Sequence, residues 1–472
     1  MNYRLAPGIA IEERGEEGFL LTTRPLRMVR LNRPLLQLAR RLAKDSVAPA
    51  SPAEAKVLET LTKGGFVRRQ WPSLAEAELP LVSIVIPVKD RAAELRDCLH
   101  SLLALDYPAG RREIIVVDDG SSDATAQVAR ELGARVVPSG AIGGGPAAAR
   151  NRGAAVAQGE ILAFIDSDCT ASKAWLRELL PVFTGTGVAA VGGFVDGMHQ
   201  AEPLDRYEAV MSSLNLGRRE MTGGAGGDTL YLPSCNLLLR RDVFVAAGGF
   251  RADLQVGEDV DLTWRLRDGG WSIVYLPQGA VCHAHRSRLW PFMKRRFDYG
   301  TSEGLLQQLH PVRGKKVLLP PLPAAIVALF CLAVLGLSPW PLVPGGLLLA
   351  GEVLATGHRL RRQGLPLAPL TILVARSRAV GSLGYYAGYH LLRYYLLPLL
   401  LAALLYPPLG GLLLVTLLGV AAVDHRVRRP RLPLPLFCGY YVLEQLAYGC
   451  GVFWGCLRQR TFASYRLQLR AH

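Results

Sequence analysis

The pattern of hydrophobic and polar positions changes twice along the chain and divides it into three regions. Between Leu81 and about Val281, almost entirely apolar runs such as 82–87 and 161–165 alternate with amphipathic segments such as 91–105. Fully apolar strands separated by helices are typical of a parallel sheet that is covered on both faces. We therefore predict an α/β fold with a Rossmann-like, mainly parallel sheet for a middle domain over residues 79–310.

The N-terminal region, residues 1–78, predicts a small separate domain. Residues 9–32 alternate apolar and polar positions around a glycine turn, which predicts a hairpin. Segments 33–43 and 51–65 predict two helices, the second with a serine N-cap and a proline in its first turn. With a closing strand over 66–71, the order is typical of a winged-helix-like module. A DNA-binding winged helix and a purely structural cap are the alternatives.

The C-terminal region, residues 311–472, is mostly apolar. It contains five apolar segments, at 317–337, 341–355, 381–406, 407–423 and 432–456. A membrane-spanning helix needs about 20 apolar residues, and the first, third and fourth segments approach that length. The second is short and contains Glu352, which predicts a tilted or re-entrant helix, and the fifth contains Glu444, which predicts an interfacial helix. We expect a membrane-embedded region of about four spans, or two hairpins, with an apolar oligomerisation domain as the alternative.

Charge and cysteine usage refine this division. Nearly all of the formal net charge of +15 lies in the C-terminal region, in clusters beside the apolar segments. Such clusters are typical of cytoplasmic membrane loops, so the charge favours a membrane partner over nucleic acid. The eight cysteines show no zinc-ligand spacing, and we expect free thiols. Because the N-terminus has no apolar secretory segment, we expect the catalytic domain to lie in the cytoplasm, at the inner face of the cell membrane.

Three polar clusters follow apolar strands of the middle domain: Pro87–Asp90, Asp118–Ser122 and Asp166–Asp168. In parallel sheets, ligands bind at the carboxyl ends of the strands. Asp166 and Asp168 would raise each other's pKa unless a cation lies between them, and Mg²⁺ typically takes one or two carboxylates plus substrate phosphates. The pattern predicts a divalent-metal site, with a polar turn at a strand end as the simpler alternative.

Five motifs then occur in a fixed order. They are VSIVIPVKDR (82–91), EIIVVDDGSSDAT (113–125), GPAAARNRGAAVAQGEILAFIDSD (145–168), CNLLLRRDVFVAAGGF (235–250) and GEDVDLTWRLRDGG (257–270). Together they closely resemble the family 2 glycosyltransferases of GT-A fold. The resemblance covers residues 81 to about 300. It implies an enzyme that transfers a sugar from a nucleotide-diphosphate donor.

The resemblance assigns the nucleotide to the first two strand ends. In the family, the strand end that contains Pro87 and Asp90 lines the uracil site. Asp119 is then the residue expected to accept the uracil N3–H, and Asp118 is expected to hold the turn. All four are candidate nucleotide-sugar residues.

Three arginines are candidates for the donor phosphates. Arg150 would add a cation near them, with a helix-surface arginine as an equal alternative. Arg295 and Arg296, in KRRFDYG at 294–300, match the family's basic-aromatic segment near the donor diphosphate. The segment lacks the family's Q-x-x-R-W signature, so processive binding of a cellulose-like chain does not follow.

The metal ligands implied by the resemblance are Asp166, Asp168 and His283. The two carboxylates would hold Mg²⁺ or Mn²⁺ against the donor diphosphate, where the metal neutralises charge on the leaving UDP. A histidine beyond the acidic motif completes the metal shell in related enzymes, and spacing favours His283 over His285. A structural histidine at a strand end is the alternative for both.

The segment GEDVDL supplies the candidate catalytic acids. An inverting transfer needs a base that removes the proton of the acceptor hydroxyl while its oxygen attacks the anomeric carbon. The family position makes Asp259 that base, with Glu258 supporting it or contacting the acceptor. Asp261 is expected to pair with Arg265 one helical turn away. Because carboxylates also stabilise helix N-termini, a structural role is the alternative for all three.

Two rival functions compete with this interpretation. FIDSDCT also fits D-x-D-x-T, the first motif of haloacid-dehalogenase-like phosphatases, but that motif normally follows the first strand of its domain and here follows several. The second rival is a sugar-nucleotide- or peptide-binding membrane protein without catalysis. The combination of Asp119, Asp166, Asp168 and Asp259 favours an enzyme, because a binding protein has no need of a base.

The N-terminal region bears on the acceptor. Its apolar positions around RLN (30–32) and GGF (64–66) resemble the PqqD-like peptide-recognition domains, which bind a leader peptide by strand addition. Such a domain before a family 2 transferase and an apolar C-terminal region resembles the glycosyltransferases of the mycofactocin system. That resemblance implies transfer of glucose from UDP-glucose, β-1,4-linked, to the peptide-derived redox cofactor mycofactocin or its precursor, with pathway proteins as possible partners. Polyprenyl phosphate or a cell-envelope polysaccharide is the alternative acceptor.

Overall fold

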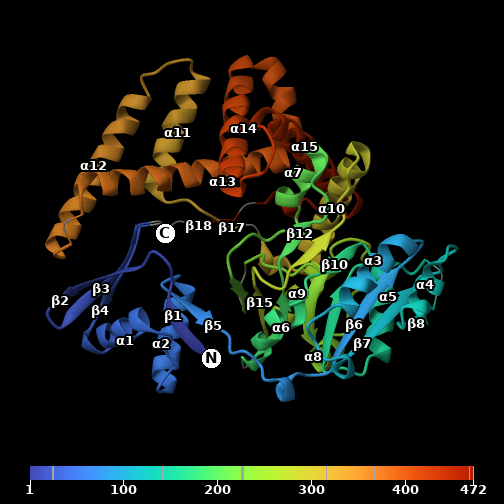
Figure 1. Cartoon of the computed structure of the whole chain (residues 1–472). Helices are drawn as coiled ribbons and strands as arrows, with labels where there is room; N and C mark the ends of the chain where they lie inside the picture. Colours follow the sequence, from blue (N-terminus) through green and yellow to red (C-terminus); the bar gives the residue numbers. More distant parts are fainter. Residues whose placement is uncertain are drawn as a thin grey trace.

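The computed structural model divides into three parts (Figure 1). It describes residues 1–23, 26–140, 143–185, 187–224, 228–314, 316–365, 367–466 and 468–470. The N-terminal strands and helices (blue) lie beside a large α/β part (cyan to yellow), and the C-terminal helices (orange and red) lie along one side of both.

The N-terminal part packs two helices on short strands. Its elements are β1 (Asn2–Leu5), β2 (Ala10–Arg14), β3 (Glu17–Thr23), β4 (Leu26–Leu31), α1 (Arg33–Lys44), α2 (Pro52–Lys63) and β5 (Val67–Gln70). Strands β2, β3 and β4 form an antiparallel meander, one strand more than the predicted hairpin, and β5 pairs with β1. The Ser51 side chain caps α2 by accepting a hydrogen bond from the Glu54 backbone N–H at 3.1 Å. Leu20, Leu42 and Leu58 are fully buried in its core.

The middle part is built on an eight-stranded sheet in the order β13-β15-β11-β14-β9-β6-β7-β8. Its strands are β6 (Val82–Val88), β7 (Arg112–Asp118), β8 (Arg135–Pro138), β9 (Ile161–Ile165), β11 (Val188–Gly192), β13 (Met221–Gly223), β14 (Asn236–Arg240) and β15 (Ser272–Tyr275). Strands β9, β6, β7 and β8 are parallel, as predicted from their apolar runs, whereas β14 is antiparallel to both of its neighbours. The sheet is therefore mixed, with a parallel half that carries the three polar clusters at its carboxyl edge.

Helices cover both faces of this sheet. They include α3 (Ala92–Leu103), α4 (Thr125–Glu131), α5 (Gly145–Val156), α6 (Trp175–Leu179), α8 (Arg241–Ala246) and α9 (Glu258–Asp268). Two further helices of this part, α7 (Pro203–Met211) and α10 (Leu289–Leu309), pack against the C-terminal part. Helix α5 lies so close to the sheet that a Cβ at Gly153 would clash with Val85 and Val117. A small second sheet, β10 (Cys169–Ala171), β16 (Val281–His283) and β12 (Val195–Gly197), brings residues next to the D-x-D motif beside His283.

The C-terminal part consists of long helices. They are α11 (Pro321–Leu335), α12 (Leu342–Arg362), α13 (Pro369–Leu405), α14 (Pro407–Arg428) and α15 (Leu434–Arg458), and β17 (Lys316–Leu318) pairs with β18 (Gln468–Arg470). Among the described residues, α13 and α14 are long and apolar enough to cross a membrane, and α11 is a shorter apolar helix. Large apolar side chains on these helices face outward, including Leu347 at 69% and Leu404 at 79% exposure.

Helix α15 packs tightly against α10 of the middle part. Glycines line the contact on both helices, at Gly300 and Gly304 in α10 and at Gly451 and Gly455 in α15, and a Cβ at any of them would lie within about van der Waals contact of the opposite backbone. Glu444 of α15 is 4% exposed and forms ion pairs with Arg296 and Arg393. The fifth apolar segment, predicted to be interfacial, therefore attaches the C-terminal part to the α/β part.

The N-terminal part also contacts both other parts. Phe19 of β3 packs in one apolar cluster with Leu360, Leu365 and Ile372 of the C-terminal part. The Arg69 guanidinium donates a hydrogen bond to the Thr222 hydroxyl of the middle part at 2.8 Å. The three parts thus surround a common centre.

Candidate active site

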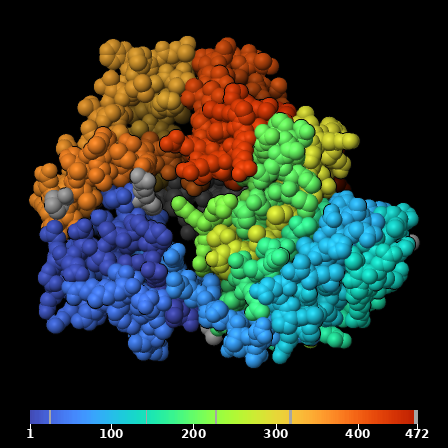
Figure 2. Space-filling model, viewed as in Figure 1, coloured from blue at the N-terminus to red at the C-terminus, as the bar shows by residue number. Residues whose placement is uncertain are grey.

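A cavity of about 1890 Å³ lies where the three parts meet. Figure 2 shows the surface hollowed between the N-terminal and α/β parts, beneath the C-terminal helices. Its walls include strand ends of the main sheet, the beginning of α9, helix α10 and one face of α13, and Arg27 reaches it from β4. The candidate residues that line it are Pro87, Asp119, Arg150, Asp166, Asp168, Glu258, Asp259, His283, Arg295 and Arg296.

The two carboxylates of the D-x-D motif are each paired with an arginine. Asp166 accepts a hydrogen bond from Arg150 at 2.6 Å, and Asp168 accepts one from Arg91 at 2.6 Å. Burial alone would raise the pKa of Asp166, but the neighbouring Arg150 holds it below the ordinary value. Both side chains are therefore held near positive charge at the end of β9.

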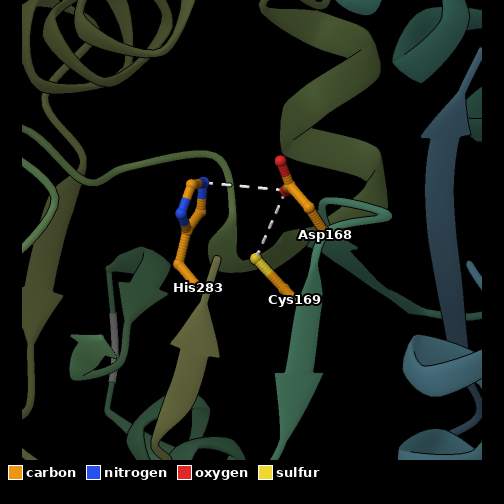
Figure 3. A group of neighbouring side chains, drawn as sticks. All are labelled: Asp168, Cys169 and His283. Carbon is orange, nitrogen blue, oxygen red and sulfur yellow. Dashed lines mark hydrogen bonds and ion pairs between the residues drawn. The ribbon is translucent and has the colours of Figure 1, made fainter. Parts of the chain in front are cut away.

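Asp168 lies beside His283 because β10 and β16 are adjacent strands. Cys169 and His283 are register partners in this pair. The Asp168 Oδ1 lies 3.6 Å from the His283 Nε2 and 4.0 Å from the Cys169 Sγ. Figure 3 shows the three side chains pointing toward one another. Their ligand atoms all lie within 4.8 Å of one another, a spacing that would let Asp168 and His283 share a divalent cation. Burial raises the pKa of Cys169 well above its ordinary value, so its thiol stays protonated. Asp166, the third predicted ligand, is not part of this group and pairs with Arg150.

His285 stacks on His283 with ring centroids 4.7 Å apart. Burial, and then the neighbouring His283, lower the pKa of His285 to about 3. The imidazole of His285 is therefore neutral at physiological pH. Both His283 and His285 line the cavity.

The predicted uracil residues separate into two groups. Pro87 and Asp119 line the cavity, whereas Asp90 and Asp118 are used in turns. The Asp90 carboxylate accepts hydrogen bonds from the Ser122 backbone N–H at 2.7 Å and from its hydroxyl at 3.0 Å. Asp118 accepts one from the Ser121 N–H at 3.0 Å. The Asp90 carboxylate, after β6, therefore binds the turn after β7 and links the ends of these two strands.

Asp119 fixes the loop that precedes α5. Its carboxylate accepts hydrogen bonds from the Ser139 hydroxyl at 2.7 Å and from the Gly144 and Gly145 backbone N–H groups at 3.1 Å each. The carboxylate thus lies at the N-terminal end of α5, where positive backbone dipoles stabilise it.

The beginning of α9 places the half-buried carboxyl group of Asp259 at the cavity. Asp259 accepts hydrogen bonds from the Ser234 N–H at 3.2 Å and the Val260 N–H at 2.8 Å. Burial, and then the nearby Glu258, raise the pKa of Asp259 to about 7. Glu258 itself pairs with Arg150 at 2.8 Å. A carboxyl group with this pKa can take up a proton at neutral pH.

Asp261 lies on the opposite, buried side of α9. It pairs with Arg265 at 2.8 Å, which confirms the predicted local ion pair, and it also meets the His310 Nε2 at 3.0 Å. His310 further contacts Asp268 at 3.4 Å. These contacts attach α9 to the segment after α10 and keep Asp261 away from the cavity.

The two arginines predicted at the diphosphate differ in their surroundings. Arg295 lies over the Tyr299 ring at 4.6 Å. Arg296 is 2% exposed and lies between Glu208 and Glu444, the second at 3.5 Å. Burial raises the pKa of Glu208 to about 7, although Arg296 lowers it. Arg296 of α10 thus forms ion pairs with Glu208 of α7 and Glu444 of α15, and these pairs hold the three helices together.

Some residues of the site do not follow from the sequence pattern. Arg91 directly follows the V-K-D turn of the first motif, but only the fold shows that it reaches Asp168. Arg27 lines the cavity from another domain. Tyr386 and its neighbours on α13 also line it, within a segment whose apolar composition predicted a membrane helix.

Comparison with known proteins identifies the family. Residues 83–246 match the model of "Glycosyl transferase family 2". The "Pre-mycofactocin glycosyltransferase" of Mycobacterium tuberculosis is 31% identical over 481 residues, covering 97% of this chain and 95% of that protein. The chain belongs to the family 2 glycosyltransferases. This glycosyltransferase therefore has the GT-A fold that its sequence motifs predicted.

Other relatives match a smaller part of this glycosyltransferase. "Glycosyltransferase AglE" of Haloferax volcanii is 32% identical over 237 residues, covering 48% of this chain and 73% of that protein. Among solved structures, the mannosyltransferase PcManGT of Pyrobaculum calidifontis, in complex with GDP-Man and Mn²⁺, matches with a TM-score of 0.40 and 20% identity. That match covers 66% of this chain and 90% of the other.

Proposed function

We propose that this glycosyltransferase moves a hexose, with inversion, from a UDP-sugar to a peptide-derived acceptor of the mycofactocin type, and that UDP-glucose is the donor. The full-length similarity to a pre-mycofactocin glycosyltransferase supports the acceptor, because it extends through the N-terminal and C-terminal parts as well as the α/β part. The observation that carries the chemistry is Asp259, a half-buried carboxyl group with a pKa of about 7 in the same cavity as Asp166 and Asp168.

Asp259 acts as the general base in this mechanism. Its carboxylate removes the proton of the acceptor hydroxyl as that oxygen attacks the anomeric carbon and UDP leaves. Backbone N–H groups of Ser234 and Val260 hold the carboxylate in place. Glu258 raises the pKa of Asp259 and is itself held by Arg150. Arg150 therefore positions Glu258, which in turn influences the neighbouring base Asp259.

Asp166, Asp168 and His283 would hold Mg²⁺ or Mn²⁺ at the donor diphosphate. The bound metal supplies positive charge that stabilises the leaving UDP. Asp119 and Pro87 line the part of the cavity proposed for uracil, and Arg295 lies near the proposed diphosphate position. Asp90 and Asp118 support this region through their turns, and Arg296 supports it through its contacts with Glu208 and Glu444.

The three parts have separate roles in the proposal. Residues 1–78 form a PqqD-like domain for peptide recognition, 79–310 the catalytic domain, and 311–472 a membrane-associated region. The outward apolar side chains of α13 and α14 support attachment to a membrane. The basic clusters beside the helices favour a catalytic domain at its cytoplasmic face.

The direct test is product analysis by mass spectrometry. Purified protein is incubated with UDP-glucose and either pre-mycofactocin or a polyprenyl phosphate, with and without EDTA. We expect hexose additions on pre-mycofactocin that EDTA abolishes and excess Mn²⁺ restores. Additions on the polyprenyl phosphate alone would contradict the acceptor, and full transfer in EDTA would contradict the metal. Donor binding without turnover on any acceptor would favour a binding protein.

A further inference from the structure

One face of α13 forms a wall of the catalytic cavity. The residues of this helix that line it include Ala379, Ser382, Leu383, Tyr386, Tyr389 and His390. Residues three and four apart lie on the same side of a helix, so this set forms one continuous stripe. In Figure 1 the helix runs beneath α11 and α12 toward α14. We call this stripe the α13 wall.

The cavity is larger than a nucleotide sugar alone requires. Its volume is about 1890 Å³, whereas ligand pockets commonly measure about 300–1,000 Å³. The main-sheet strand ends and the D-x-D motif form the donor side. The α13 wall comes from a different part of the chain, and Asp259 lines the same cavity. Space therefore remains for a second substrate bounded by α13.

The α13 wall presents an aromatic ring. Tyr386 is 66% exposed, whereas Leu383 on the same wall is 8% exposed. Tyr385 meets the Tyr386 ring at an interplanar angle of 76° with centroids 5.2 Å apart, an edge-type contact that leaves a ring face open. One turn earlier, Ser382 has a small side chain and Leu383 is packed away at 8% exposure, and Ala379 two turns earlier is also small. A flat ring can therefore lie against Tyr386 without displacing a bulky neighbour.

We propose that the α13 wall binds the acceptor and selects a compact, ring-bearing, hydroxylated molecule. The ring lies against Tyr386, and a hydroxyl reaches Asp259. This inference rests on the proposed function and makes its acceptor class specific. A polyprenyl chain instead needs a long aliphatic surface, and Leu383 is the one branched aliphatic residue among the six wall residues named above.

The test measures binding of a ring ligand separately from turnover. The probe is 4-nitrophenyl β-D-glucopyranoside, titrated calorimetrically into the full-length protein in detergent, with UDP-glucose titrated in parallel. Tyr386→Ala removes the ring, Ser382→Leu fills the space beside it, and Tyr386→Phe retains the stacking face. Leu391→Ala is the matched control, because Leu391 is on the same helix, is 43% exposed and does not line the cavity.

We expect Tyr386→Ala and Ser382→Leu to weaken probe binding at least about tenfold, while the Kd for UDP-glucose stays within about twofold. Tyr386→Phe and Leu391→Ala should bind the probe like wild type. The inference is overturned if the wild type does not bind the probe, or if both wall variants bind it normally. It is also overturned if Tyr386→Ala weakens polyprenyl phosphate binding instead. If the wild type binds the probe through Tyr386 but transfers no sugar, the wall stands and the proposed function fails.

Discussion

The contact between α10 and α15 leads to a sharp prediction about one glycine. A Cβ added at Gly451 would lie well inside van der Waals contact of the Phe297 backbone carbonyl oxygen. Backbone cannot rotate away as a side chain can, so Gly451→Ala must push the two helices apart. Gly439 is on the same helix, and a Cβ added there would have no other atom within 4 Å, which makes Gly439→Ala the matched control.

The two substitutions should change the free energy of unfolding by different amounts. Replacing a helical glycine with alanine favours the helix by about 1 kcal/mol, a gain that both variants share. Overpacking costs about 1–3 kcal/mol, and this cost falls on Gly451→Ala alone. We therefore expect Gly451→Ala to be about 1–3 kcal/mol less stable than Gly439→Ala.

Thermal unfolding of the detergent-solubilised protein, followed by tryptophan fluorescence, measures this difference. We expect Gly451→Ala to unfold several degrees below Gly439→Ala. Activity should fall as well, because α10 carries Arg295 and Arg296 at the cavity. Equal unfolding temperatures for the two variants would refute the tight contact between α10 and α15.

Three further predictions concern charge in and around the site. The pKa of Asp259 is about 7 and a base must be deprotonated, so kcat/KM should rise through pH 7 and level off above it; a flat profile from pH 5 to 8 would contradict this role. Asp168→Asn should weaken Mn²⁺ binding, followed by electron paramagnetic resonance with UDP present, at least about tenfold, and unchanged affinity would exclude Asp168 as a ligand. Glu444→Leu leaves Arg296 and Arg393 without this buried carboxylate, at a cost of about 3–5 kcal/mol, so its unfolding temperature should fall sharply; a wild-type value would show that the pairs contribute nothing.

The sheet and the order of its motifs were predictable because local patterns encode them. Runs such as Val82–Val88 are apolar at nearly every position, and a strand buried on both faces needs that composition. The Asp261–Arg265 pair follows from helical spacing alone. Such features depend on neighbours in the sequence.

The partners of the site's charges depend on the fold and were not predictable. Arg150 was expected near the phosphates, yet it lies between Asp166 and Glu258, residues far apart in the sequence. Glu444 suggested an interfacial helix, because a carboxylate in an apolar segment usually meets water. Its arginine partners lie on two other helices, and their positions are set by tertiary packing.

The composition of α13 predicted a membrane span, and the helix is long and apolar enough for one, but composition did not reveal its cavity-lining face. Its hydropathy averages a cavity-lining face with an outward apolar face, so the helix passes the length and composition test for a membrane span. The stripe that contains Tyr386 becomes visible only when the cavity is known.

The central claim is that Asp259 is the base of sugar transfer, and Asp259→Asn tests it most directly. The measurement is hexose transfer from UDP-glucose to pre-mycofactocin in Mn²⁺, with the Kd for UDP-glucose determined on the same preparation. General-base catalysis contributes about 10²–10⁴-fold, so transfer should fall by that factor while donor affinity stays within about twofold. Transfer at the wild-type rate by Asp259→Asn would contradict the account.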